Sequence, residues 1–143
     1  MSNTLISIDP GGTTGWAQFE LSDGGVVNFD EVKGKEQFFD WLTEQNPKII
    51  VCEDFHLFPN KAQAQIWSDM ETVRIIGAIE YFCRINKIEF VLQKPNVKSI
   101  AYMWAGIKVP KNHAATHKTD AYVHGVYYLQ KNGLRKPQQG AGK

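Results

Sequence analysis

The fold of this chain is decided by one stretch, Leu5-Ile6-Ser7-Ile8-Asp9-Pro10-Gly11-Gly12-Thr13-Thr14-Gly15-Trp16-Ala17. The stretch predicts an apolar strand that ends in one carboxylate, Asp9. A turn must follow at once, because Pro10 fixes the backbone and three glycines lie close behind it. The chain returns through Trp16 to Leu21 as a second apolar run, so we expect a hairpin with an acid at its mouth. Taken alone, Asp9 is more simply a residue that caps its own turn, and the rest of the chain must decide.

The composition is that of one globular domain. The chain has 143 residues, of which 43% are hydrophobic, and this is enough to bury a core. No run of about 18 apolar residues could cross a membrane, and the N-terminus lacks a basic segment followed by an apolar signal core. We therefore expect a soluble protein that stays inside the cell and has no membrane partner. Cys52 and Cys83 lack zinc-site spacing, so we expect them to be buried free thiols.

Strands and helices alternate after the opening hairpin. The turn signal Ser22-Asp23-Gly24-Gly25 precedes a predicted third strand from Val26 to Val32. Apolar residues at helical spacing then predict a helix from Lys35 to Gln45. Lys48 to Phe55 is apolar on both faces at its core, as is typical of a central strand, and it ends in a second acid, Glu53.

A long helix is predicted from Lys61 to Asn86. Gly77 lies on its apolar face, and we expect this glycine to allow close packing against a neighbouring element. Three acids on the helix, Asp69, Glu71 and Glu80, are expected to be solvated surface charges.

The second half continues with a strand from Lys87 to Gln93, a short helix from Val97 to Ala105 and a last helix from Thr116 to Lys131. Together these elements predict an α/β fold. Its mixed five-stranded sheet combines an antiparallel meander of strands one to three with parallel strands four and five, flanked by helices on both faces. We expect a single domain over residues 1–131 and a basic, flexible tail over residues 132–143.

This topology brings the acids together. If strands one and four are parallel neighbours, Asp9 and Glu53 lie side by side at their carboxyl ends. On the last helix His117, Asp120 and His124 fall at i, i+3 and i+7, on one stripe. A cluster of carboxylates needs cations, and Mg²⁺ or Mn²⁺ fits oxygen ligands best. Two such ions suit phosphodiester hydrolysis, with His117 as a further ligand or a general acid or base.

The charge is unevenly distributed along the chain. Residues 1–55 hold ten acids and three bases, whereas residues 56–143 hold five acids and thirteen bases. The excess of bases in the second half is typical of a protein that binds a phosphate-rich partner. A solvated basic surface that binds no ligand explains the same excess equally well. If DNA is the partner, the expected phosphate-contacting residues are Lys94, Lys98, Lys108, Lys111 and Lys118.

The sequence resembles the RuvC-like Holliday junction resolvases of the RNase H-like superfamily, particularly compact phage or bacterial versions. The matching segments are Ile8-Asp9-Pro10-Gly11 with Thr14-Gly15-Trp16-Ala17, Val51-Cys52-Glu53-Asp54-Phe55, and His117-Lys118-Thr119-Asp120-Ala121. The resemblance implies an RNase H-like fold in which Asp9, Glu53 and Asp120 are catalytic and metal-binding acids. His117 would take the family's fourth position.

The same resemblance implies what the protein does. It implies a metal-dependent endodeoxyribonuclease that resolves four-way (Holliday) junctions or other branched DNA. The sequence leaves open whether this serves recombination, genome-packaging debranching or repair. A homodimer would nick two strands symmetrically, using a metal-activated water. The implied location is the cytoplasm of a bacterial or phage-infected cell.

Two other functions fit parts of the sequence. The segment Asp-Pro-Gly-Gly-Thr-Thr-Gly also resembles the phosphate-binding hairpin of actin-like ATPases and sugar kinases. Those folds need two such domains, and the 143 residues contain no second segment that matches this one. A non-catalytic nucleic-acid-binding module of the same fold is the other alternative. Three carboxylates that face DNA without a metal would weaken binding, which argues against it.

Overall fold

The computed structural model describes residues 1–55, 63–109 and 116–137. In these ranges one five-stranded sheet has the order β3-β2-β1-β4-β5. Its elements are β1 (Thr4–Asp9), β2 (Thr13–Glu20), β3 (Val26–Lys33), α1 (Lys35–Thr43), β4 (Ile49–Glu53), α2 (Gln63–Asn86), β5 (Glu89–Gln93), the short 3-10 helix η1 (Pro95–Val97), α3 (Lys98–Ala105) and α4 (His117–Lys131). No helix in the described part of the chain is both long and apolar enough to span a membrane.

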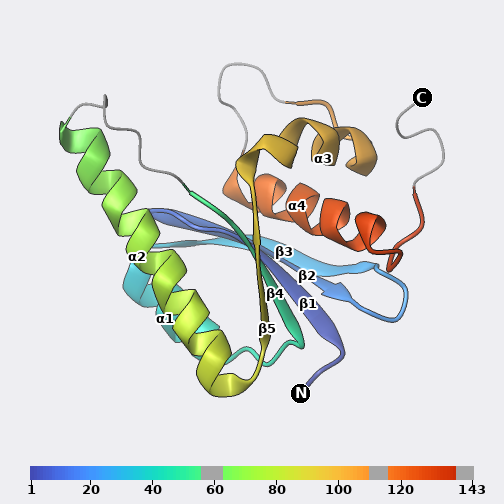
Figure 1. Cartoon of the computed structure of the whole chain (residues 1–143), viewed down its shortest axis with the longest axis horizontal. Helices are drawn as coiled ribbons and strands as arrows, with labels where there is room; N and C mark the ends of the chain where they lie inside the picture. Colours follow the sequence, from blue (N-terminus) through green and yellow to red (C-terminus); the bar gives the residue numbers. More distant parts are fainter. Residues whose placement is uncertain (56–62, 110–115, 138–143) are drawn as a thin grey trace.

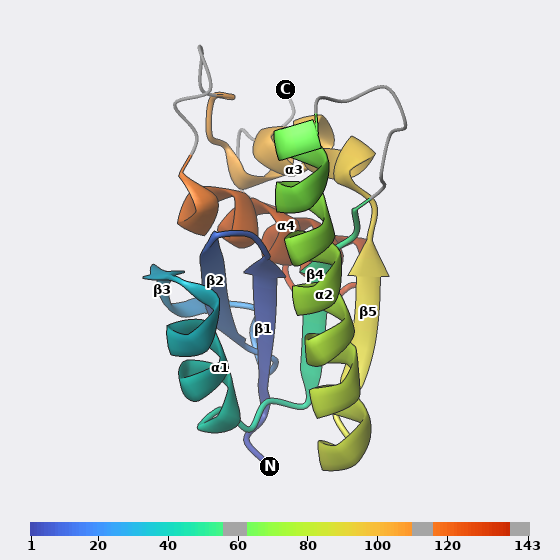
Figure 2. The ribbon, with the colours of Figure 1, turned by 90° about the vertical axis from the view of Figure 1, so that its left-hand side faces the viewer.

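The sheet is mixed, as predicted. β1 pairs antiparallel with β2, and β2 pairs antiparallel with β3. β4 lies parallel to β1 on one side and to β5 on the other. α1 and α2 cover one face of the sheet, and α3 and α4 cover the other (Figures 1 and 2). The predicted fold class is therefore confirmed.

The element boundaries differ from the sequence-based ones by only a few residues. The last helix begins at His117 because Thr116, in extended conformation, is its N-cap and accepts a hydrogen bond from the backbone N–H of Thr119. The short helix predicted from Val97 is preceded by η1, because Pro95 can occupy the first turn of a helix. The first two residues of the predicted long helix, 61 and 62, lie outside the described residues.

β1 fixes the position of Asp9 because it is buried along its whole length. Leu5 packs on the side of α3 and α4, whereas Ile6 packs on the side of α1 and α2. Side chains alternate along a strand, so Asp9 lies on the same face as Leu5, beneath α4. Cys52 and Cys83 are buried free thiols, as expected.

Two expectations about α2 are wrong. A Cβ at Gly77 would meet no described atom within 4 Å, so this glycine does not permit a close contact. The close approach occurs instead at Gly125 of α4, where a Cβ would lie 2.3 Å from the ring of Phe19. Asp69 is buried, with 4% of its surface exposed, although Glu71 and Glu80 are on the surface as expected. Apolar periodicity places residues on a helix face, but it does not say which face has a partner.

The first residues after α4 contact the domain. The backbone N–H of Leu134 donates to the carbonyl of Leu129 at 2.8 Å. The guanidinium of Arg135 donates to the carbonyl of Gly24 at 2.9 Å and lies over the ring of Tyr122. The remainder of the predicted tail, residues 138–143, lies outside the described residues.

The two helix glycines make a matched pair for a stability test. We expect Gly125→Ala to lower the free energy of unfolding by about 1–3 kcal/mol, because the added methyl group overpacks the contact with Phe19. Gly77→Ala adds a methyl group that meets no described atom. Because alanine favours the helix more than glycine does, this variant should raise the free energy of unfolding by about 0.5–1 kcal/mol. Urea unfolding of both variants checks this, and equal effects would contradict the close packing of α4 on β2.

Candidate active site

Two carboxylates stand side by side where parallel strands end. The register pairs Ile8 of β1 with Cys52 of β4, so the next residues, Asp9 and Glu53, are neighbours. Their side chains are only 11% and 12% exposed. Both line a cavity of about 220 Å³ at this edge of the sheet. The sequence-based expectation that the two acids are adjacent agrees with this geometry.

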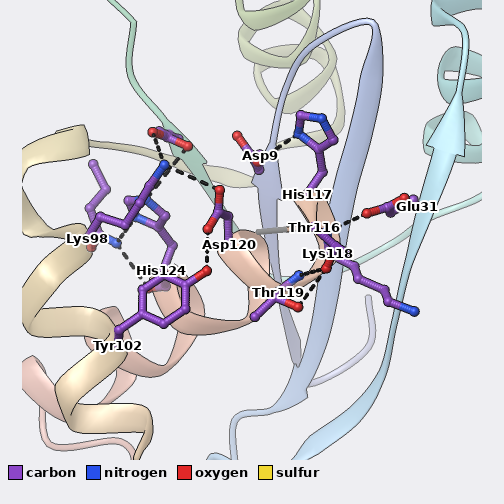
Figure 3. Close-up of polar contacts among 12 residues, drawn as sticks. Asp9, Glu31, Lys98, Tyr102, Thr116, His117, Lys118, Thr119, Asp120 and His124 are labelled. Atoms are coloured by element: carbon purple, nitrogen blue, oxygen red, sulfur yellow. Dashed lines mark hydrogen bonds and ion pairs between the residues drawn. The ribbon is translucent and has the colours of Figure 1, made fainter. Parts of the chain in front are cut away.

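The N-terminus of α4 brings two more of the predicted residues to the same cavity. His117 and Asp120 both line it, and Nδ1 of His117 lies 3.1 Å from Oδ2 of Asp9 (Figure 3). The helix can approach so closely only because residue 15 of β2 is a glycine. A Cβ at Gly15 would lie 2.0 Å from the carbonyl oxygen of His117.

α3 supplies two partners to Asp120 from one face. Lys98 and Tyr102 are four residues apart and therefore lie above one another on the helix. The Tyr102 hydroxyl donates to Oδ1 of Asp120 at 2.6 Å, and Nζ of Lys98 donates to Oδ2 at 3.3 Å (Figure 3). Nζ of Lys98 is also 3.5 Å from Oε1 of Glu53. Sequence reasoning missed Tyr102, and its spacing from Lys98 is the signal that could have pointed to it.

The crowding of carboxylates changes their acidity. Burial raises the pKa of Glu53 to about 8, and its hydrogen bond with Asp9 and the charge of Asp9 act in the same direction. Burial also acts to raise the pKa of Asp9, but hydrogen bonds from His117 and Glu53 outweigh it and lower this pKa. Glu53 therefore carries the proton of the pair near neutral pH, and it donates that proton to Asp9.

Two cationic side chains offset the remaining charge. The hydrogen bond with Asp9 raises the pKa of His117, although partial burial opposes it. Burial acts to lower the pKa of Lys98, but Glu53 and Asp120 outweigh it, so this pKa is raised. Both side chains thus favour their charged forms beside the acids.

His124 also faces the cluster, one helical turn beyond Asp120. It is fully buried, and Nε2 of its ring lies 3.7 Å from Oε2 of Glu53. Burial lowers the pKa of His124 to about 4, so the ring is neutral near pH 7. The stripe of His117, Asp120 and His124 therefore lies along the carboxylates of the sheet.

The predicted phosphate-contacting lysines do not form one group. Lys98 points into the acid cluster, where its ammonium lies close to both Glu53 and Asp120. Lys94 is exposed next to the start of η1, and Lys108 is exposed beyond the end of α3. Lys118 is half-buried, and its backbone N–H donates to Glu31 at 3.2 Å. Lys111 lies outside the described residues.

The donor set fits a hard divalent cation. As their side chains lie, no three His, Cys, Asp or Glu residues of the described ranges are arranged to hold a metal ion. The ammonium of Lys98 and the proton of Glu53 instead compensate the charge of the cluster. Carboxylate oxygens are the ligands that Mg²⁺ prefers, and a cation could replace both the proton and the ammonium. Binding would require Lys98 to swing away from Glu53 and Asp120.

Comparison with solved structures identifies the fold. RuvC from Thermus thermophilus, in complex with a Holliday junction substrate, matches with a TM-score of 0.61 and 13% sequence identity over 94% of this chain and 99% of that one. A second structure of Thermus thermophilus RuvC matches over the same shares, with a TM-score of 0.54 and 14% identity. No family model and no curated protein matches the sequence. The chain therefore has an RNase H-like, RuvC-like fold.

The pKa of Glu53 predicts how stability depends on pH. In protein without divalent metal, the free energy of unfolding should fall as the pH rises from about 6.5 to about 8. Over this window the folded state holds the Glu53 proton and the unfolded state, with an ordinary pKa of 4.5, does not. Below pH 6.5 the effect is offset, because the unfolded state protonates His124 and the folded state does not.

Urea unfolding in EDTA at several pH values measures this dependence. The Glu53 proton alone accounts for a slope of at most about 1.4 kcal/mol per pH unit, and His117, whose pKa is also raised, acts in the same direction. Glu53→Gln is the matched control, because its amide cannot titrate and only the opposing contributions of His117 and His124 should remain. A stability that is flat or rising over this window in the unaltered protein would contradict the shared proton.

Proposed function

We propose that this protein is a metal-dependent endonuclease that hydrolyses phosphodiester bonds in branched DNA, with four-way junctions as its substrate class. The observation that carries the proposal is the convergence of three carboxylates, Asp9, Glu53 and Asp120, in one cavity at the carboxyl ends of parallel strands. The RuvC-like fold supports it, because the same edge of the sheet is where ligands gather in open α/β folds.

Asp9, Glu53 and Asp120, with His117 beside them, would hold Mg²⁺ or Mn²⁺, two ions per site. When bound, such ions activate a water and stabilise the charge on the leaving oxygen. His117 is half-exposed at the rim, where it can hold or deliver a proton next to Asp9. Lys98 lines the same cavity, so its ammonium would be available to a phosphate once a cation has released it from Glu53 and Asp120.

Branched DNA is favoured over other phosphodiesters on two grounds. Thermus thermophilus RuvC, which shares the fold over nearly the whole chain, binds a Holliday junction substrate. From Lys94 onward this chain carries nine basic residues and one acid, a balance that suits a phosphate backbone. A junction has two equivalent strands to cut, so we propose a homodimer with one site per protomer.

Removal of one carboxylate tests the chemistry. Asp9→Asn should reduce cleavage of a labelled four-way junction by at least about 100-fold, because the amide cannot serve as an anionic ligand. Junction binding should persist. Asp40→Asn is the matched control, since Asp40 is exposed on α1 and does not line the cavity, and its variant should cleave normally. Gel analysis of junction, linear duplex and flap substrates, with Mg²⁺ or EDTA, gives both readouts.

Two results would contradict the proposed function. One is junction cleavage that survives in EDTA or in Asp9→Asn. The other is hydrolysis of ATP without cleavage of any DNA substrate, which would favour the phosphate-binding ATPase alternative.

The lysines are tested separately by the salt dependence of junction binding. Lys108→Gln should lower the log-log slope of affinity against salt by about 0.9, the value for one lost phosphate contact. Lys48→Gln is the control, because this exposed lysine directly precedes β4 and therefore lies at the end of that strand opposite Glu53. Fluorescence anisotropy in EDTA measures both slopes without cleavage, and equal slopes would remove Lys108 from the DNA surface.

A further inference from the structure

A buried pair of side chains stands behind Glu53. Gln93, at the end of β5, is in register with Glu53 on β4, so both side chains project from the same face of the sheet. His124 reaches this point from α4 and is fully buried there. Its ring lies between the two, with Nδ1 2.9 Å from the amide of Gln93 and Nε2 3.7 Å from Oε2 of Glu53.

The backbone determines which ring nitrogen of His124 carries the proton. The amide nitrogen Nε2 of Gln93 lies 3.0 Å from the carbonyl oxygen of His124 as well as 2.9 Å from Nδ1. A carbonyl oxygen can only accept, so the group that touches it must be the NH₂ of Gln93 and not its oxygen. The same NH₂ then donates to Nδ1, which must be unprotonated. A neutral ring with this arrangement carries its proton on Nε2.

That Nε2–H group is unsatisfied among the described residues. It is buried and has no hydrogen-bond partner there, and the acceptor that it faces, Oε2 of Glu53, is beyond hydrogen-bond length. A buried donor without an acceptor is unfavourable. A rotation of the Glu53 carboxylate that shortens the distance from Oε2 to Nε2 of His124 by less than about 1 Å would give this N–H group an acceptor.

We propose that His124 is a positioning residue for Glu53. Its neutral ring donates from Nε2 to Oε2 of the ionised carboxylate, and this bond leaves Oε1 to face the cavity shared with Asp9 and Asp120. Gln93 has an indirect role: its amide donates to Nδ1 of His124 and so keeps the ring in the tautomer that can donate from Nε2. The inference rests on the proposed function, in which Glu53 is a ligand to a divalent cation.

A neutral donor suits this position better than a charged one. A cationic side chain behind Glu53 would compete with a metal ion for the carboxylate, as Lys98 does on the cavity side at 3.5 Å. A neutral N–H orients the ligand without that competition. Full burial keeps the ring of His124 out of contact with solvent.

The first experiment reads the tautomer directly in unaltered, full-length protein. Two-dimensional ¹H–¹⁵N spectra of histidine side chains at pH 7 distinguish Nδ1–H from Nε2–H rings. We expect His124 to be the Nε2–H form without metal, and addition of Mg²⁺ alone should move its Nε2–H resonance downfield as the bond to Glu53 shortens. An Nδ1–H ring, or an Nε2–H resonance that saturating Mg²⁺ leaves unmoved, would overturn the inference.

The second experiment compares three substitutions at one position. In His124→Gln the amide NH₂ can take the place of Nε2–H, whereas the shorter side chain of His124→Asn and the ring of His124→Phe cannot donate there. Calorimetric titration with Mg²⁺ alone should show affinity lowered about 10- to 100-fold in the Asn and Phe variants. The Gln variant should stay within about threefold of the unaltered protein.

Controls separate a positioning role from a loss of structure. Leu129→Ala, buried on the same helix and away from the acids, gives the Mg²⁺ affinity of a destabilised but intact site. Equal Mg²⁺ affinity in all three His124 variants would overturn the inference and leave the proposed function standing. An unaltered protein that binds no Mg²⁺ would instead overturn the proposed function. Because the spectrum is recorded on unaltered protein, it decides the matter even where His124→Phe does not fold.

Discussion

The placement of Asp9 beside Glu53 is the constraint on which the rest of the site depends. Two buried strands that pair in parallel end in carboxylates at neighbouring positions, so two like charges meet in a poorly solvated edge of the sheet. The protein compensates with a proton on Glu53, the ammonium of Lys98 and the imidazole of His117. All three can be exchanged or moved, which is what a site for a divalent cation requires.

The position of α4 is constrained by the edge of the sheet at which Asp9 and Glu53 lie. Its first turn must come within contact distance of β2 to place His117 and Asp120 near the strand acids, and the absence of a side chain at Gly15 permits this. Further along, Gly125 lies against Phe19, so the helix is seated on the sheet at two points. Tyr102 and Lys98 of α3 then fix both oxygens of Asp120. The third carboxylate is thus held by the packing of α4 on the sheet and by hydrogen bonds from α3.

Much of this arrangement was predictable from sequence, and the reasons are local. Alternation and turn residues predicted the strands, and the rule that parallel strands end at one edge predicted that Asp9 and Glu53 meet. Helical spacing placed Asp120 with His117 and His124. The direction of Lys98 was not predictable, because a lysine on a helix can point to solvent or to acids. The roles of Tyr102, Gln93 and Gly15 were equally hidden, since each depends on an element that is distant in the sequence.

The central claim is that a divalent cation replaces the proton held by Glu53 next to Asp9. Calorimetric titration of the protein with Mg²⁺ at pH 7, repeated in buffers with different ionisation enthalpies, counts the protons released on binding. With a Glu53 pKa of about 8, we expect release of about one proton per protein chain. Mg²⁺ binding without proton release, or no binding at all, would contradict the claim.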